Sequence, residues 1–252
     1  MRILSIDSSL GTQLAVVDAA TSAAGARALQ VLSQDEQADT RRHAESLGQM
    51  LSRALSAPEA AERPLDAVVA ATGPAPFTGL RAGLVTAGVV GRTRGIPVHG
   101  VSSLDAVARR ALDELGSHEG QTGPVVLVAT DARRREVYTA LFRANGPDDV
   151  TRLTEIIVCP PAQVAQRLAE QAPGPGGGSG GIDVVAGSGT SLYPELAEMA
   201  SYQKALAPVS GDALTQVRIA LARLERGEEL STQPLYLRHA DVQMPAARKR
   251  VR

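Results

Sequence analysis

One pattern constrains the fold of this 252-residue chain more than any other: an apolar strand that ends in an aspartate occurs twice. The first copy covers residues 2–7 and ends at Asp7, and the second begins at Pro124 and ends at Asp131. In each copy a turn and another apolar strand follow. Repetition of one supersecondary unit predicts two related lobes, each with its own sheet.

The segments after each aspartate follow a common order, which is more complete in the first half. Three strands, a helix, a strand and a second helix are expected there, and the second half contains a degenerate version. We therefore expect an α/β chain in two lobes of the β-β-β-α-β-α kind. The predicted boundaries are residues 1–108 for the first lobe, 109–238 for the second, 172–181 for a Gly/Pro-rich insertion and 239–252 for a basic tail.

Composition limits how the core is built and where the chain works. Aromatic residues make up only 2% and hydrophobic residues 44%, so Ala, Val, Leu and Ile must fill the core. A formal net charge of −1 gives no overall field toward nucleic acid. The single cysteine, Cys159, excludes an internal disulfide, and no segment approaches ~18 uninterrupted apolar residues. We expect a cytoplasmic protein with no membrane-spanning helix.

Two short loops have the composition of a nucleotide-binding site. Asp7, Ser8 and Ser9 form a strand end and turn that could hold a phosphate and its cation, and Gly187 and Gly189 could adjoin an adenosine. An Asp-Ser-Ser sequence also begins ordinary hairpins, so a purely structural turn is the competing interpretation.

Two helices of the first lobe contain more apolar and small residues than one buried stripe requires. Met50 and Leu51 differ by ~100° around a helix, so both cannot point fully inward. We expect a partner surface here, and a close-packed core is the alternative. The predicted partner-binding residues are His43, Leu47, Met50, Leu51, Leu80, Gly83, Leu84 and Ala87.

Three consecutive arginines, Arg133 to Arg135, follow the second aspartate. They could hold phosphate or RNA, or they could form a solvated hairpin turn. The four histidines, by contrast, show no spacing typical of a metal site. These are His43, His99, His118 and His239.

Taken in order, these segments resemble one family. The segments that carry the resemblance are IDSS, RRHAESL, GPAPFTGLRAGL, GVSSLDAVA, DARRREVY and PLYLR. Together they make the chain similar to the TsaB family, also called YeaZ, from Arg2 to about Arg238. Two departures are mild: Ala75 and Pro76 stand where the family usually has Gly-Ser, and Ser8 where it usually has Thr. The resemblance implies an actin/Hsp70-like, ribonuclease H-like fold.

The resemblance also implies a role without catalysis. The related TsaD subunit holds its catalytic metal with two histidines, and the matching positions here are Ser103 and Val107. No catalytic residue, metal or cofactor is therefore expected. The family's task is to bind a TsaD-type subunit and, with a TsaE-type ATPase, to support threonylcarbamoyl transfer to adenosine 37 of tRNAs that read ANN codons. Contact with tRNA would be indirect, and a homodimer could form when the TsaD-type subunit is absent.

Other functions stay open at this point. One is an actin-like ATPase or small-molecule kinase that uses Asp7 and the Gly187–Gly189 loop. A metallopeptidase is a second, which the missing histidine pair disfavours. The third is a dimerising scaffold outside tRNA modification, and complex formation with a TsaD-type subunit separates it from the family's role.

Overall fold

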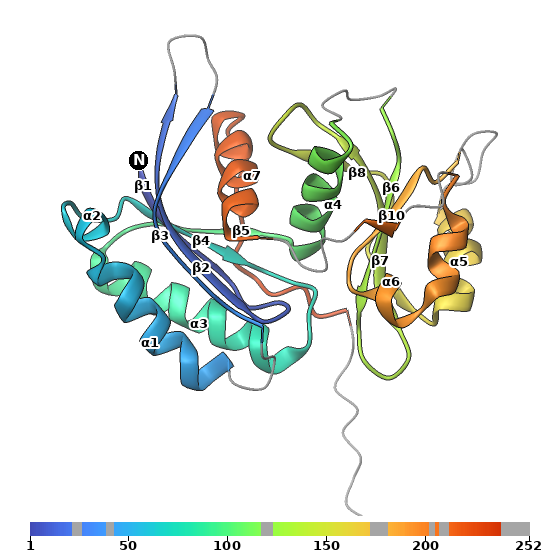
Figure 1. The fold of residues 1–252 in the computed structure, drawn as a ribbon, viewed down its shortest axis with the longest axis horizontal. Coiled ribbons are helices and arrows are strands. Elements are labelled where there is room, and N and C mark those ends of the chain that lie inside the picture. Colours follow the sequence, from blue (N-terminus) through green and yellow to red (C-terminus); the bar gives the residue numbers. More distant parts are fainter. Residues whose placement is uncertain are drawn as a thin grey trace, which may run out of the picture.

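Two sheets stand side by side in the computed structural model (Figure 1). The structure describes residues 1–21, 27–38, 43–116, 123–171, 181–201, 205–206 and 212–237. The predicted α/β architecture of two lobes is confirmed, and the mixed sheets fit an actin-like, ribonuclease H-like fold.

The first sheet has the strand order β3-β2-β1-β4-β5. β1, β2 and β3 pair antiparallel, whereas β4 and β5 join β1 in parallel. Every residue of β1 is buried, because helices cover both faces of the sheet. The strands are β1 (Arg2–Asp7), β2 (Thr12–Thr21), β3 (Arg27–Gln37), β4 (Ala67–Ala71) and β5 (Val98–Val101).

Three helices follow the strands of this sheet in chain order: α1 (His43–Ser56), the short α2 (Pro58–Ala61) and α3 (Phe77–Arg94). α1 and α3 pack on the face that carries Leu4 and Ile6. α3 ends at Gly95, whose φ of 66° gives the left-handed backbone that closes a helix at low cost.

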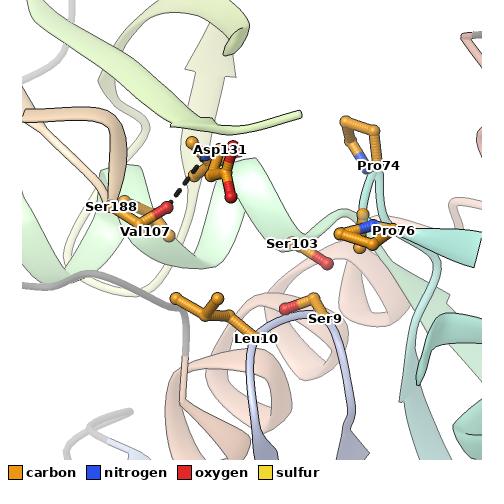
Figure 2. Close-up of a pocket in the computed structure, with 10 residues that line it drawn as sticks. Ser9, Leu10, Pro74, Pro76, Ser103, Val107, Asp131 and Ser188 are labelled. Carbon is orange, nitrogen blue, oxygen red and sulfur yellow. Dashed lines mark hydrogen bonds between the residues drawn. The ribbon is translucent and has the colours of Figure 1, made fainter. Parts of the chain in front are cut away.

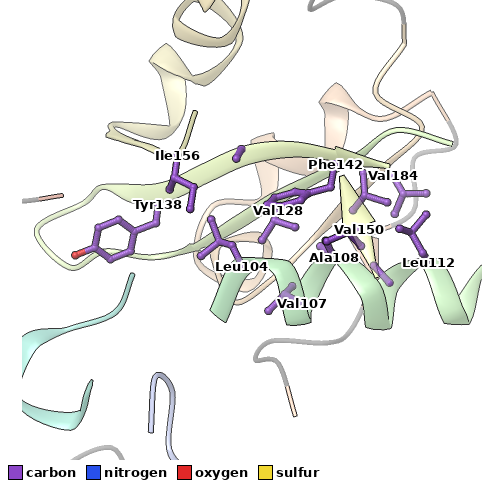
Figure 3. Packing of buried hydrophobic residues seen from close by; sticks show 14 of the residues in the cluster. Leu104, Val107, Ala108, Leu112, Val128, Tyr138, Phe142, Val150, Ile156 and Val184 are labelled. Atoms are coloured by element: carbon purple, nitrogen blue, oxygen red, sulfur yellow. The ribbon is translucent and has the colours of Figure 1, made fainter. Parts of the chain in front are cut away.

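The second sheet has the order β11-β10-β6-β7-β8, with β9 pairing to β7. Helix α4 (Ser103–Glu114) covers one face through Leu104, Val107 and Leu112, which pack on Val128 and Phe142 (Figure 3). The strands are β6 (Val126–Asp131), β7 (Val137–Ala144), β8 (Val150–Arg152), β9 (Ile157–Cys159), β10 (Val184–Ala186) and β11 (Ala205–Leu206).

Short helices cover the other face of the second sheet. Val164 and Leu168 of α5 and Leu196 of η2 pack there with Cys159, which is buried and free of any disulfide. Burial raises the pKa of the Cys159 thiol, which favours a packed, protonated side chain over a reactive thiolate. These helices are η1 (Pro161–Gln163), α5 (Val164–Gln171), α6 (Gly189–Leu192) and η2 (Pro194–Met199).

The lobes exchange helices in a way that chain order does not reveal. The last helix, α7 (Ala213–Glu225), falls in the predicted second lobe but packs on the first sheet through Ala213, Val217 and Ala220. α4, which begins inside the predicted first lobe, packs on the second sheet. Both helices therefore lie between the two sheets (Figure 1), and the simple division at residue 108 needs this correction.

Some predictions fall outside the described residues. They concern the basic tail over 239–252, His118, His239 and the predicted insertion over 172–181, of which only Gly181 is described. For His43 the structure describes the backbone alone. In the part of the chain that the structure covers, no helix is both long and apolar enough to cross a membrane.

Candidate functional site

A small pocket lies between the two lobes, where the ends of β1, β4 and β6 meet the start of α4 (Figure 2). Its cavity volume is about 20 Å³, which is room for about one water molecule. Hydroxyl groups from both lobes line it, beside apolar and carboxylate groups. The lining residues are Ser9, Leu10, Pro74, Ala75, Pro76, Ser103, Val107, Thr130, Asp131 and Ser188.

The carboxylate of Asp7 does not line this pocket. Its side chain is 3% exposed, Gln216 Nε2 donates to its Oδ2 at 2.8 Å, and Ser9 donates to its Oδ1 through both the backbone N–H and the hydroxyl. Burial raises the pKa of Asp7 to about 6 against the opposing effect of the Ser9 hydrogen bonds. The carboxylate thus joins β1 to α7 inside the molecule.

Ser8 is also committed to an internal contact. Its hydroxyl donates to the Gly79 carbonyl oxygen at 2.8 Å, and its side chain packs directly on Gly83 of α3. A Cβ atom at Gly83 would overlap Ser8 Oγ, so glycine is needed there for α3 to approach the strand end. Of the three residues predicted to meet a nucleotide in the first lobe, only Ser9 lines the pocket.

The second lobe repeats the arrangement around Asp131, the expected counterpart of Asp7. Asp7 Oδ1 accepts from the Ser9 N–H and Asp131 Oδ1 accepts from the Arg133 N–H, each at 2.8 Å. Each aspartate ends its strand, so the equivalence predicted from sequence is confirmed. The Asp131 N–H also donates to Ser188 Oγ at 2.9 Å, which ties β6 to the loop after β10.

The two glycines of that loop pack against protein backbone. Gly187 has a φ of 111°, and a Cβ on it would collide with the Ala129 carbonyl oxygen. A Cβ on Gly189 would lie 2.8 Å from the same oxygen. Close approach to β6 therefore explains both glycines, and neither lines the pocket.

The start of α4 brings Ser103 and Val107 to the pocket wall, one helical turn apart (Figure 2). Ser103 is 3% exposed, and its hydroxyl has no hydrogen-bond partner among the described residues. A serine hydroxyl and a valine side chain offer little to a metal ion. Among the described residues, no group of three or more His, Cys, Asp or Glu side chains could hold one.

Most of the residues predicted to bind a partner point into the first lobe instead. Leu47, Met50, Leu80 and Ala87 are at most 3% exposed, and buried Gly83 meets Ser8. The prediction of an exposed surface is wrong for these residues, because the helix faces that carry them pack against the first sheet. Leu51 and Leu84 are partly buried against the same core, and the side chain of His43 is not described.

The exposed apolar face of α3 carries different residues. Val85 and Val89 are 65% and 55% exposed, and Gly88 beside them has open space around it. Arg81, one turn before Val85, donates its Nε–H to the Tyr236 hydroxyl at 3.0 Å. We call Arg81, Val85, Gly88, Val89 and Tyr236 the α3 surface. Its signal in the sequence was the four-residue spacing from Arg81 to Val85 to Val89.

Sequence reasoning also missed a network of arginines and aspartates between the lobes. Asp105 of α4, 2% exposed, pairs with Arg152 at 2.9 Å and Arg223 at 2.8 Å. Asp149, before β8, pairs with Arg223 at 2.9 Å and with Arg226. These contacts join α4, α7 and the second sheet.

Comparison with known proteins decides the family. The model of the family described as "TsaD: tRNA N6-adenosine threonylcarbamoyltransferase" matches residues 30–173. The tRNA threonylcarbamoyladenosine biosynthesis protein TsaB of Bacillus subtilis is 36% identical over 88 residues, 34% of each chain. A Pseudomonas aeruginosa structure described as similar to the peptidase YEAZ superposes with a TM-score of 0.68 at 25% identity, over 94% of this chain and 99% of that one. The chain belongs to the TsaB (YeaZ) family.

Two further matches cover different shares of the chain. The YeaZ structure from Pseudomonas aeruginosa covers 94% of this chain with a TM-score of 0.67 at 24% identity, and it supports the fold alone. A Mycobacterium tuberculosis protein of uncharacterised function is 46% identical over 123 residues, which are 47% of this chain. That match covers 53% of the relative, so the chain spans about half the length of the mycobacterial proteins it resembles.

Proposed function

We propose that this chain is the non-catalytic partner subunit of a TsaD-type enzyme that transfers a threonylcarbamoyl group to adenosine 37 of tRNAs that read ANN codons. Membership of the TsaB family supports the pathway. The observation that carries the non-catalytic role is the placement of Ser103 and Val107. They line the pocket between the lobes, and the family resemblance pairs them with the metal-binding histidines of the TsaD subunit.

The pocket around these residues also lacks the room that a reacting group needs. A cavity of about 20 Å³ is far smaller than the clefts that hold substrates. Pro74 and Pro76 occupy one wall and Leu10 another (Figure 2). This packing supports a subunit that acts through binding, with no catalytic residue and no cofactor of its own.

The α3 surface is the best place for the partner. Val85 and Val89 present adjacent apolar side chains to the surface, and Gly88 lets a second helix approach closely. A TsaD-type subunit of the same fold class would offer a matching helix. When that subunit is absent, a second copy of this chain could occupy the surface, which makes a homodimer the competing assembly.

The alternative function, an ATPase or kinase, has less support from the structure than it had from the sequence alone. Asp7 accepts hydrogen bonds from Gln216 and Ser9, and Ser8 donates to the backbone of α3. These groups would have to leave buried contacts before they could meet a phosphate or its cation. We therefore assign ATP hydrolysis to a separate TsaE-type ATPase and expect the complex to work in the cytoplasm, where it meets tRNA.

Reconstitution tests this proposal. Unmodified tRNA is incubated with the threonylcarbamoyl adenylate donor, a TsaD-type subunit, a TsaE-type ATPase and ATP, with and without this chain. We expect modified adenosine only when this chain and the TsaD-type subunit are both present. Modification by this chain without the TsaD-type subunit, or an unchanged rate when this chain is omitted, would contradict the proposal.

A further inference from the structure

The turn between β6 and β7 has an unusual backbone for its residues. Arg133, Arg134 and Arg135 have φ values of 62°, 54° and 61°, which is the left-handed region for three successive side chains. All other residues with positive φ in the described part of the chain are glycines. This backbone is strained for a residue other than glycine, and such residues cluster at functional sites. Three arginines in this conformation therefore point to a use for their side chains.

The turn is held firmly from both sides. Asp131 Oδ1 accepts from the Arg133 N–H at 2.8 Å, and Asp131 Oδ2 pairs with the Arg133 guanidinium at 3.2 Å. The Ala132 N–H donates to the Glu136 carbonyl oxygen at 2.9 Å, and the Glu136 N–H donates to the Arg133 carbonyl oxygen at 3.1 Å. The backbone is thus fixed, while all three arginine side chains are exposed.

A rigid turn that presents guanidinium groups suits a phosphate ligand. Guanidinium matches the two-oxygen geometry of phosphate with paired hydrogen bonds, which a flexible lysine does not. Asp131 and Glu136 offset part of the positive charge, so the turn acts at short range and not through a long-range field. The turn joins β6 to β7 in the second lobe, whereas α3 packs on the first sheet (Figure 1).

We propose that the Arg133–Arg135 turn is a binding site for backbone phosphates of RNA. This inference rests on the proposed function, because a subunit of a tRNA-modifying complex meets RNA as its substrate. It replaces the purely indirect contact with tRNA that the family resemblance implied. Glycine would relieve the strain at this turn, but it has no side chain that could pair with a phosphate.

The test uses the full chain in complex with the TsaD-type subunit and measures affinity for an unmodified tRNA by fluorescence anisotropy at several KCl concentrations. The double variant Arg134→Gly and Arg135→Gly removes two guanidiniums and suits the left-handed backbone. We expect affinity to fall about tenfold and the slope of log affinity against log salt to drop by about one to two. Thermal stability should be unchanged or higher, because glycine adopts this backbone without strain.

Two matched variants control for charge and for stability. Arg167→Gln removes an exposed arginine from α5 and should change neither the affinity nor the salt slope. Arg134→Lys with Arg135→Lys keeps the charge and should keep most of the salt slope. Unchanged tRNA affinity in the glycine variant, or a clear loss of its melting temperature, would overturn the inference. Loss of pairing between the wild-type chain and the TsaD-type subunit would instead count against the proposed function.

Discussion

Gln216 Nε2 donates a 2.8 Å hydrogen bond to Asp7 Oδ2, and so connects the last helix to the end of the first strand. The two residues are 209 positions apart in the sequence. Gln216 is fully buried, and its Oε1 has no hydrogen-bond partner in the part of the chain that the structure describes. Because Asp7 is buried too, this bond makes the strand end part of the core.

The raised pKa of Asp7 predicts a pH dependence of stability. The pKa is about 6 in the folded protein, above the ordinary aspartate value of 3.8, so the folded state binds the proton more tightly than the unfolded chain. The contribution of Asp7 to stability should therefore be largest below about pH 4, fall as pH rises toward about 6, and level off above that.

The variant Asp7→Asn should remove this dependence. An asparagine keeps the acceptor for Ser9, and its amide can donate to Gln216 Oε1 if the Gln216 amide turns over. Melting temperatures of the two proteins from pH 4.5 to 8 should converge at low pH, and the variant should be more stable at neutral pH, by at most about 3 kcal/mol. A variant less stable than the wild type at pH 7.5 would show that the charged carboxylate is favoured.

The contact between Gly83 and Ser8 predicts a pair of coupled substitutions. Gly83→Ala should destabilise the first lobe by about 1–3 kcal/mol, because its Cβ would overlap Ser8 Oγ. Adding Ser8→Ala removes the overlapping oxygen and should recover part of the loss. Urea unfolding of the two single variants and the double variant gives the coupling energy. Strict additivity would mean that the two residues do not press on each other.

The network around Asp105 predicts a large and salt-insensitive loss of stability. Asp105→Ala removes the buried carboxylate that Arg152 and Arg223 share and leaves Arg223 paired with Asp149 alone, so it should cost about 2–3 kcal/mol. Asp35→Ala is a matched control, since Asp35 pairs with exposed Arg53 and should cost at most about 1 kcal/mol. Denaturant unfolding at low and high salt measures both. Equal, small losses would indicate that the network adds little to the lobe contact.

Local sequence patterns predicted the elements of the fold well, but not all of their packing. The match between Asp7 and Asp131 could be predicted because each follows an apolar strand and precedes a turn. The packing of α7 on the first sheet could not be predicted in this way, because contacts such as that of Gln216 with Asp7 join distant segments and leave no periodic signal in the sequence.

The candidate site was predicted in outline only. Asp7, Ser8 and the Gly187–Gly189 loop do lie where strands end, yet their polar groups and close contacts are internal. Helix periodicity placed Met50 and Leu51 on adjacent faces without showing which faced the sheet, and the structure buries Met50. The spacing of Val85 and Val89 places both on one stripe of α3, but the sequence does not show that this stripe is the exposed one.

The central claim is that the α3 surface pairs this chain with a TsaD-type subunit. Calorimetric titration of that subunit with the Val85→Asp variant tests this claim most directly. The account predicts that a carboxylate here weakens pairing at least about tenfold, or about 1.4 kcal/mol, while circular dichroism of the free chain is unchanged. Val31→Asp, which changes a valine that is 43% exposed on β3, should pair like the wild type. Wild-type affinity in Val85→Asp would contradict the account and move the interface away from α3.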